Sequence, residues 1–220
     1  MEKSIHLDRP NVVGVIHTAG GFAETRNAGL DAVEIRVDAL TDPPSERQVA
    51  DLPVAAIVTV RHREEGGVRE TSEEDRLATY FDLLPAAAAI DCEMRSAETM
   101  RDLLDAVRRE GKILVLSFHD FETTPPLADL RDMCTKMRGL GADIVKIAVK
   151  TETVAEVSRL LALLEDASGP LAVMGMGALG RASRLLFAKA GSVLNYGWLD
   201  KPQVPGQWSA KEFIDLLART

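Results

Sequence analysis

The chain has 220 residues, of which 46% are hydrophobic and 27% are charged, and this composition is typical of a globular protein with a sizeable core. Its 34 acidic residues outnumber its 26 basic ones, and a net charge of −8 argues against general binding to nucleic acid or to an anionic membrane surface. There is no membrane-span-length apolar run and no secretory pattern at the start, so we expect a cytoplasmic protein.

Apolar runs of strand length alternate along the chain with segments of helical periodicity. The runs cover residues 12–16, 32–37, 54–60, 87–93, 112–118, 143–149, 170–176 and 192–197. The clearest helical segments are 96–111, with Ser96 as the expected N-cap, 126–141 and 153–169. Buried strands that alternate with helices predict a parallel sheet.

The number of strand–helix units predicts the fold more closely. Eight units in about 200 residues predict an α/β protein with a closed (β/α)₈ TIM barrel, and a doubly wound open sheet is the alternative. No linker or low-complexity segment divides the chain, so we expect a single catalytic domain over residues 1–220. Cys92 and Cys134 have neither disulfide nor metal-ligand spacing and are expected to be free thiols. Nothing in the sequence calls for a metal.

In such a barrel the catalytic groups lie at the C-terminal ends of the strands. Charged and histidine side chains collect at the expected strand ends, namely Glu34, Arg36, Arg61, Glu65, His119, Lys146 and Arg184. Each of them alone could be a solvated surface residue. Together they predict a site at that end of the barrel.

Lys146 stands out because it lies in the middle of the apolar run "GADIVKIA". A buried lysine can be a paired structural residue, but desolvation also favours the neutral amine, which attacks carbonyl carbons. Lys146 is therefore a candidate for Schiff-base formation. Spacing alone leaves open whether it points into the barrel, with Ile144 and Ala148, or outward, with Val145 and Ile147.

His119, in "LSFHDFETTP", is the second candidate. Histidine can accept and return a proton near neutral pH, and an iminium on a neighbouring strand would acidify the adjacent C–H bonds. A carboxylate should orient the imidazole, and Glu65 and Asp120 are both candidates. The remaining histidines, His6, His17 and His62, are weaker candidates.

These residues carry a family resemblance. The segments "VEIRVDAL", "TVRHREEGG", "IDCE", "SFHDFETTP", "GADIVKIAVK", "VMGMGALGRASRLL", "AGSVLNYG" and "VPGQ" occur in order, and together they resemble type I 3-dehydroquinate dehydratase. The resemblance implies a barrel, usually a homodimer, that works without metal or cofactor. It also implies the dehydration of 3-dehydroquinate to 3-dehydroshikimate, the third step of the shikimate pathway to chorismate and the aromatic amino acids.

The resemblance implies roles for individual residues as well. It makes Lys146 the Schiff-base residue, His119 the general acid/base and Glu65 the carboxylate that orients the histidine. It makes Arg184 the residue that grips the substrate carboxylate. The other substrate-binding residues that it implies are Glu34, Arg36, Arg61, Gln207, Met174, Met176 and Tyr196.

Some positions depart from the family pattern. The lid carries the bulkier Gln203 and Val204, Ile35 replaces a frequent aromatic, and Tyr196 stands where phenylalanine is common. The segment before the first strand is short, so we expect any hairpin over the barrel bottom to be short or absent.

Four other functions fit parts of the sequence. Gly175, Gly177 and Gly180 form a G-x-G-x-x-G pattern with Asp200 downstream, but that dinucleotide fingerprint belongs to the first βαβ unit of a domain and here lies near the chain's end. A Schiff-base aldolase would share Lys146, and a non-catalytic metabolite-binding module would share the pocket. A phosphate-binding barrel would use the glycine-rich loop.

Overall fold

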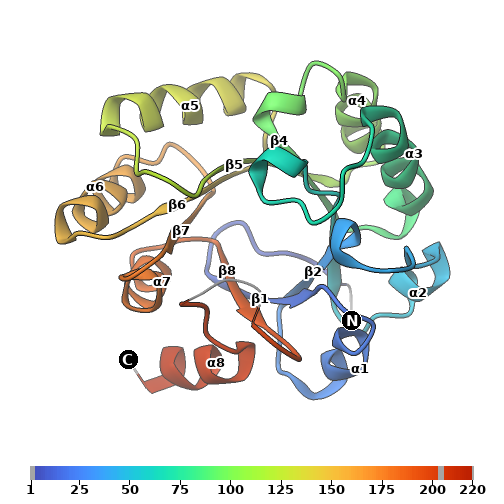
Figure 1. Ribbon diagram of the computed structural model, residues 1–220, viewed down its shortest axis with the longest axis horizontal. Coiled ribbons are helices and arrows are strands. Elements are labelled where there is room, and N and C mark those ends of the chain that lie inside the picture. Colours follow the sequence, from blue (N-terminus) through green and yellow to red (C-terminus); the bar gives the residue numbers. More distant parts are fainter. Residues whose placement is uncertain (1–2, 203–205, 220) are drawn as a thin grey trace.

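The structure is a computed structural model that describes residues 3–202 and 206–219, and its strands and helices alternate around a central barrel (Figure 1). The strands are β1 (Asn11–Ile16), β2 (Ala32–Arg36), β3 (Ala55–Thr59), β4 (Ala89–Glu93), β5 (Ile113–Asp120), β6 (Ile144–Lys150), β7 (Leu171–Met176) and β8 (Leu194–Trp198). The helices are α1 (Gly21–Glu24), α2 (Glu46–Ala50), α3 (Glu73–Leu83), α4 (Arg101–Arg109), α5 (Leu127–Gly139), α6 (Val154–Glu165), α7 (Gly180–Lys189) and α8 (Ala210–Arg219). This alternation produces the expected parallel arrangement.

The eight strands form one parallel sheet in the order β7-β6-β5-β4-β3-β2-β1-β8. At the seam, the backbone N–H of Val193 donates to Leu171 O over 3.0 Å, just before β8 begins. The Ser192 hydroxyl accepts from the Val173 N–H over 2.9 Å. These bonds join β8 to β7, so the predicted barrel is confirmed and the open doubly wound sheet is wrong.

Two apolar cores hold the barrel together, one on each face of the sheet. Val145 and Ile147 of β6 point outward and pack in the larger core beneath the helices. Ile144 and Ala148 point inward and belong to the core inside the barrel. Because side chains alternate along a strand, Lys146 shares the inward face with Ile144 and Ala148. The orientation that the sequence left open is thereby settled.

The helices follow the predicted segments with one correction. Thr153 caps α6 through a capping box with Glu156, as its position before the periodic run implies. The helix expected from Ser96 begins only at Arg101, and Met94–Ser96 form a short 3₁₀ turn instead. The structure places the N-cap position of α4 at Met100, and the Ser96 hydroxyl instead accepts a hydrogen bond from Arg76 of α3 over 3.0 Å.

Close packing accounts for the glycine-rich segment at the end of β7. A Cβ on Gly175 would lie 2.2 Å from the Ser183 hydroxyl and 2.3 Å from the Thr151 hydroxyl, and one on Gly180 would lie 3.3 Å from Gly175 O. These glycines let the start of α7 approach the strand. The pattern therefore needs no bound nucleotide to explain it.

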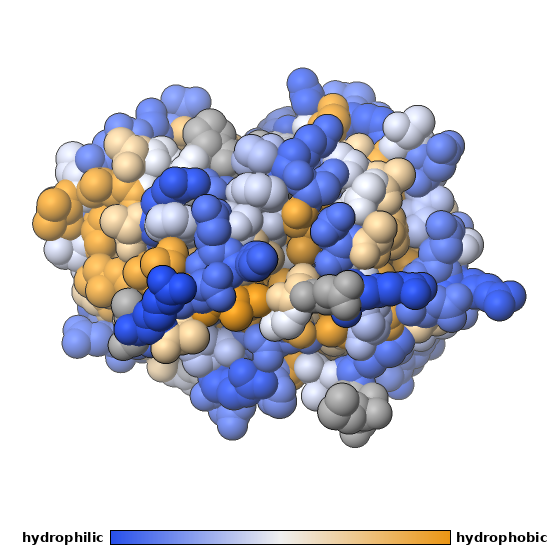
Figure 2. Space-filling model, turned by 90° about the horizontal axis from the view of Figure 1, so that it is seen from below, coloured by the Kyte–Doolittle hydropathy of each residue, from blue (hydrophilic) through white to orange (hydrophobic). Residues whose placement is uncertain are grey.

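Charged and polar side chains cover most of the face seen in Figure 2, and apolar surface lies in smaller patches between them. Among the described residues, no helix combines the length and the apolar character needed to cross a membrane. The exposed large apolar side chains of that part of the chain are Leu7, Val68, Phe81, Phe121, Leu140, Val154 and Leu186.

A glycine in β8 generates a test of this packing. A Cβ on Gly197 would lie 2.5 Å from Ala210 Cα and 2.6 Å from Ala210 N, so Gly197→Ala must push α8 away from β8. We expect the free energy of unfolding to fall by about 1–3 kcal/mol, as overpacking does. Urea unfolding measures it. Gly139→Ala is the matched control and should not destabilise the protein, because its added methyl group would meet no described atom within 4 Å apart from its chain neighbours and its own helix backbone.

Candidate active site

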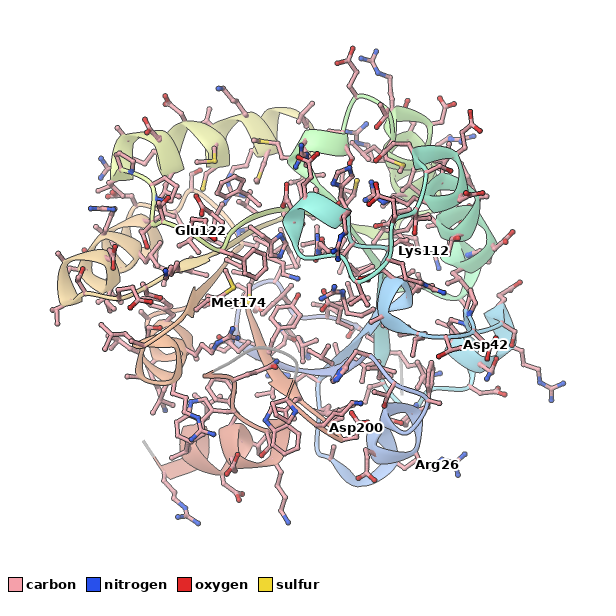
Figure 3. All side chains as sticks on the ribbon, viewed as in Figure 1. Arg26, Asp42, Lys112, Glu122, Met174 and Asp200 are labelled. Carbon is pink, nitrogen blue, oxygen red and sulfur yellow. The ribbon has the colours of Figure 1, made fainter. Side chains whose placement is uncertain are left out.

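A small cavity of about 70 Å³ opens at the C-terminal ends of the strands. Its lining residues are Val15, Glu34, Arg36, Arg61, Glu65, Gly66, His119, Phe121, Lys146, Ala148, Met174, Met176, Arg184, Tyr196 and Gln207. Every residue that the sequence analysis assigned to the site is among them. Figure 3 shows Met174 of β7 directed toward the barrel axis. Wider clefts of about 730 and 410 Å³ lie elsewhere, so chemistry rather than size distinguishes this cavity.

The ammonium group of Lys146 is buried but fully paired. Its Nζ donates to Glu34 Oε1 over 2.8 Å and to Asp91 Oδ2 over 2.7 Å. It also lies 4.2 Å from the centre of the Tyr196 ring, within the range of a cation–π contact. Two carboxylates and an aromatic face thus replace the water that burial removes. The lysine is tethered at the bottom of the cavity.

Asp91 is a site residue that the sequence analysis missed. It is completely buried on β4, and its Oδ2 also accepts from Arg61 Nη2 over 2.9 Å, while its Oδ1 accepts from the Ser117 hydroxyl over 2.6 Å. Burial alone would raise the pKa of Asp91, but the charges of Arg61 and Lys146 hold it well below its ordinary value. Asp91 is therefore an anion shared by two cations. The signal was present in "IDCE", where Asp91 and Glu93 share one face of the strand.

His119 and Glu65 form the second paired element of the site. Glu65 Oε2 lies 3.0 Å from His119 Nδ1 and also accepts from the His119 backbone N–H over 2.9 Å. Asp120, the other candidate partner, instead accepts from the backbone N–H groups of Glu122 and Thr123 and so shapes its own loop. The structure brings Glu65, not Asp120, to the histidine.

Burial favours the neutral forms of both partners. It raises the pKa of Glu65 to about 7, against the lowering effect of the Arg61 charge. Burial, and then the charges of Arg61 and Lys146, hold the pKa of His119 well below 6.5. Because Glu65 occupies Nδ1, Nε2 is the ring nitrogen that remains for a reacting group.

Three buried polar groups in this cavity have no partner among the described residues: Arg184 Nε, Tyr196 OH and Gln207 Oε1. Arg184, in α7, is only 6% exposed, and burial lowers its pKa to about 10. An unpaired guanidinium is a ready site for a carboxylate, and the phenol and amide can bond hydroxyl groups. The cavity is therefore suited to a small, hydroxylated anion.

A second missed residue, Asp38, organises the rim of the site. Its carboxylate holds Arg36 through Nε and Nη2, both over 2.8 Å. It also accepts from the backbone N–H groups of Arg61 over 3.2 Å and Val68 over 3.0 Å. Asp38 thus ties the end of β2 to the loop that carries Glu65. Of the predicted lid, Gln207 is described and buried, whereas Gln203 and Val204 lie outside the described residues.

Comparison with known proteins identifies what this arrangement resembles. The family model for type I 3-dehydroquinase matches residues 19–219. The chain is 31% identical over 209 residues to the 3-dehydroquinate dehydratase of Methanocella arvoryzae, covering 94% of each chain. It is 35% identical over 204 residues to that of Desulfotalea psychrophila, covering 90% of each. The crystal structure of 3-dehydroquinate dehydratase from Aquifex aeolicus superposes with a TM-score of 0.84 at 30% identity, covering 94% of this chain and 97% of the other.

The raised pKa of Glu65 predicts a pH-dependent stability. The folded protein holds the Glu65 proton up to a pH of about 7, against 4.5 for an ordinary glutamate. The stabilisation that this proton provides is complete below 4.5 and is lost as the pH rises to about 7. Glu65→Gln lacks this dependence, so it should gain about 3 kcal/mol of stability relative to the unaltered protein across that range.

Urea unfolding at several pH values measures the difference. Glu64→Gln removes the neighbouring, exposed carboxylate and controls for the loss of one negative charge. A difference between Glu65→Gln and the unaltered protein that stays constant with pH would contradict the assignment.

Proposed function

The chain belongs to the type I 3-dehydroquinase family and is a hydro-lyase that acts on 3-dehydroquinate, and we propose that it does so through a Schiff base on Lys146. One observation supports the mechanism: a single small cavity holds a buried primary amine, and it also holds a buried guanidinium that has no acceptor among the described residues. A cyclic ketone that bears a carboxylate satisfies both groups. Family membership favours this reading over the aldolase, the binding module and the phosphate-binding barrel.

The first step needs a neutral amine and an acceptor for its proton. Glu34 and Asp91 both bond Lys146 Nζ, and Glu34 carries the less heavily paired carboxylate, since its Oε1 otherwise accepts from the Thr59 hydroxyl over 3.1 Å. The amine adds to the ring ketone, and loss of water gives a protonated imine. The Tyr196 ring, 4.2 Å from Nζ, stabilises the positive charge that the imine retains.

His119 then moves protons at the neighbouring carbons. The neutral imidazole removes a proton from the carbon beside the imine, and the resulting enamine stores the electron pair. Glu65, 3.0 Å from Nδ1, holds the ring and stabilises the imidazolium that forms. The imidazolium protonates the departing hydroxyl, which leaves as water. Hydrolysis of the conjugated imine releases 3-dehydroshikimate and restores the lysine, so that one water is lost overall.

The remaining cavity residues bind and orient the substrate in this scheme. Arg184 takes the carboxylate with its free donors, and Gln207 and Tyr196 bond ring hydroxyls. Glu34 and Arg36 of β2 and Arg61 after β3 contact hydroxyl groups of the substrate. Met174 and Met176 of β7 form an apolar wall beside its ring. All of these groups line the same cavity.

Four further features remain proposals that accompany this function. We expect residues 1–220 to form a single catalytic domain that needs no metal or cofactor. We expect a homodimer, which sedimentation equilibrium tests directly. We also expect the protein to be located in the cytoplasm, which fits an enzyme of the shikimate pathway.

Lys146→Ala tests the covalent route. Borohydride reduction in the presence of 3-dehydroquinate should trap an adduct on Lys146, found by peptide mass mapping, and Lys146→Ala should lose both the adduct and the turnover. Lys150→Ala, on the same strand but outside the cavity, is the matched control and should keep both. Turnover by Lys146→Ala at a comparable rate would refute the Schiff base.

Arg184→Met tests the carboxylate site and predicts opposite effects on binding and stability. The variant should bind 3-dehydroquinate about 10- to 100-fold more weakly, because a hydrogen bond to a charged group contributes about 1.5–3 kcal/mol. It should also unfold less readily, since it removes a buried charge that has no partner among the described residues. Steady-state kinetics and urea unfolding measure the two effects. Lys189→Met, exposed on the same helix, is the control, and unchanged binding by Arg184→Met would contradict the assignment.

A further inference from the structure

A buried arginine outside the cavity contacts the network that holds the site. Arg76 belongs to α3, on the outer layer of the barrel, yet it is only 1% exposed. Its Nη2 donates to Glu93 Oε2 in a short ion pair, and its Nη1 donates to Glu73 Oε1 over 2.5 Å. Arg76 does not line the cavity, so it cannot touch the substrate directly.

Glu93, the completely buried last residue of β4, uses its two oxygens for different partners. Oε1 accepts from Arg61 Nη1 over 2.7 Å and from the His62 backbone N–H over 3.0 Å. Oε2 accepts from Arg76. Glu93 therefore lies between one guanidinium inside the cavity wall and one beneath the helix layer. The orientation of its carboxylate depends on both.

The guanidinium of Arg76 is itself fixed by more than this pair. Its Nε donates to Val60 O over 2.9 Å, at the residue immediately before Arg61, and its Nη1 also reaches the Ser96 hydroxyl over 3.0 Å. The planar guanidinium of Arg76 thus joins the segment that carries Arg61 to the end of β4, where Glu93 lies. A guanidinium suits this task because its donors are held rigidly in one plane, whereas a lysine has a single flexible ammonium group.

We propose that Arg76 is a positioning residue for the dehydration: it fixes Glu93, which in turn fixes Arg61 and the loop after β3 at the cavity wall. This proposal rests on the proposed function, because it concerns the rate of that reaction. Arg61 also bonds Asp91, the partner of Lys146, so a shift of Arg61 reaches the reacting amine. Misplacement by about 1 Å can lower a catalysed rate about 100-fold.

A purely structural role would give a different result. A buried ion pair is weak evidence for stability, and its replacement often leaves a protein folded. If Arg76 served the fold alone, folded variants would retain their turnover. If it acts through Glu93, its effect on turnover should disappear once Glu93 can no longer respond to it.

The experiment is a double-mutant cycle on kcat/KM for 3-dehydroquinate with Arg76→Lys and Glu93→Gln, at a temperature where circular dichroism shows each variant folded. Arg76→Lys keeps the buried charge and should lower kcat/KM about 10- to 100-fold. Glu93→Gln should lower it at least as much, and adding Arg76→Lys to Glu93→Gln should cost less than about twofold more. Glu73→Gln, which removes the half-exposed outer partner of Arg76, is the control and should stay within about twofold of the unaltered protein.

The outcomes separate this inference from the function on which it rests. If the unaltered protein does not turn over 3-dehydroquinate, the proposed function fails. If it does, and folded Arg76→Lys stays within about twofold of it, the positioning role of Arg76 is overturned. Independent, multiplicative effects of Arg76→Lys and Glu93→Gln would also overturn it, because Arg76 would then not act through Glu93.

Discussion

The burial of positive charge in the middle of a parallel barrel is the constraint on which the rest of the structure depends. Removing Lys146 and Arg61 from water is costly unless carboxylates accept their hydrogen bonds. Asp91 bonds both cations, Glu34 bonds the lysine, and Glu93 bonds the arginine. Because Lys146 and Arg61 each bond two of these carboxylates, loss of any one carboxylate leaves a buried cation with one partner fewer. The carboxylates that make the burial of these cations tolerable are therefore the same ones that hold the proposed reactive lysine in place.

Barrel geometry explains why these groups meet. In a (β/α)₈ barrel, alternate strands contribute the inward side chains of one layer. Glu34, Asp91, Lys146 and Tyr196 come from β2, β4, β6 and β8, and the three contacts of Lys146 join them into such a layer. Two residues earlier on the same strands, the layer below is apolar: Ala32, Ala89, Ile144 and Leu194. These four side chains thus form one layer of the barrel interior, and the apolar layer packs directly beneath it.

The sequence predicted a feature well where the residue type and its local pattern indicated that feature. It predicted less well where the role of a side chain depends on contacts with distant segments. The apolar run around Lys146 indicated a buried strand, and strand-end polarity indicated the cavity residues. Asp38 and Asp91 were missed, because their importance lies in partners on neighbouring strands that periodicity does not reveal. The misplaced helix start at Ser96 has the same origin, since the hydroxyl expected to cap the helix bonds a side chain from α3. Local pattern specifies an element, whereas tertiary partners decide how a polar side chain is used.

The buried cations differ in whether the protein supplies them with an anionic partner, and this difference fits the proposed function. Lys146 and Arg61 are neutralised within the protein, but Arg184 is buried without an acceptor among the described residues, which lowers stability. A substrate carboxylate would supply the missing partner, so the cost of burying Arg184 in the free protein becomes a gain on binding. In the proposed Schiff-base route, Lys146 exchanges its carboxylate contacts for a covalent bond, and Glu34 and Asp91 remain to balance the charged imine. In this scheme Arg184 binds the substrate carboxylate and Lys146 reacts with the ketone, so these two positive charges of the cavity have separate roles.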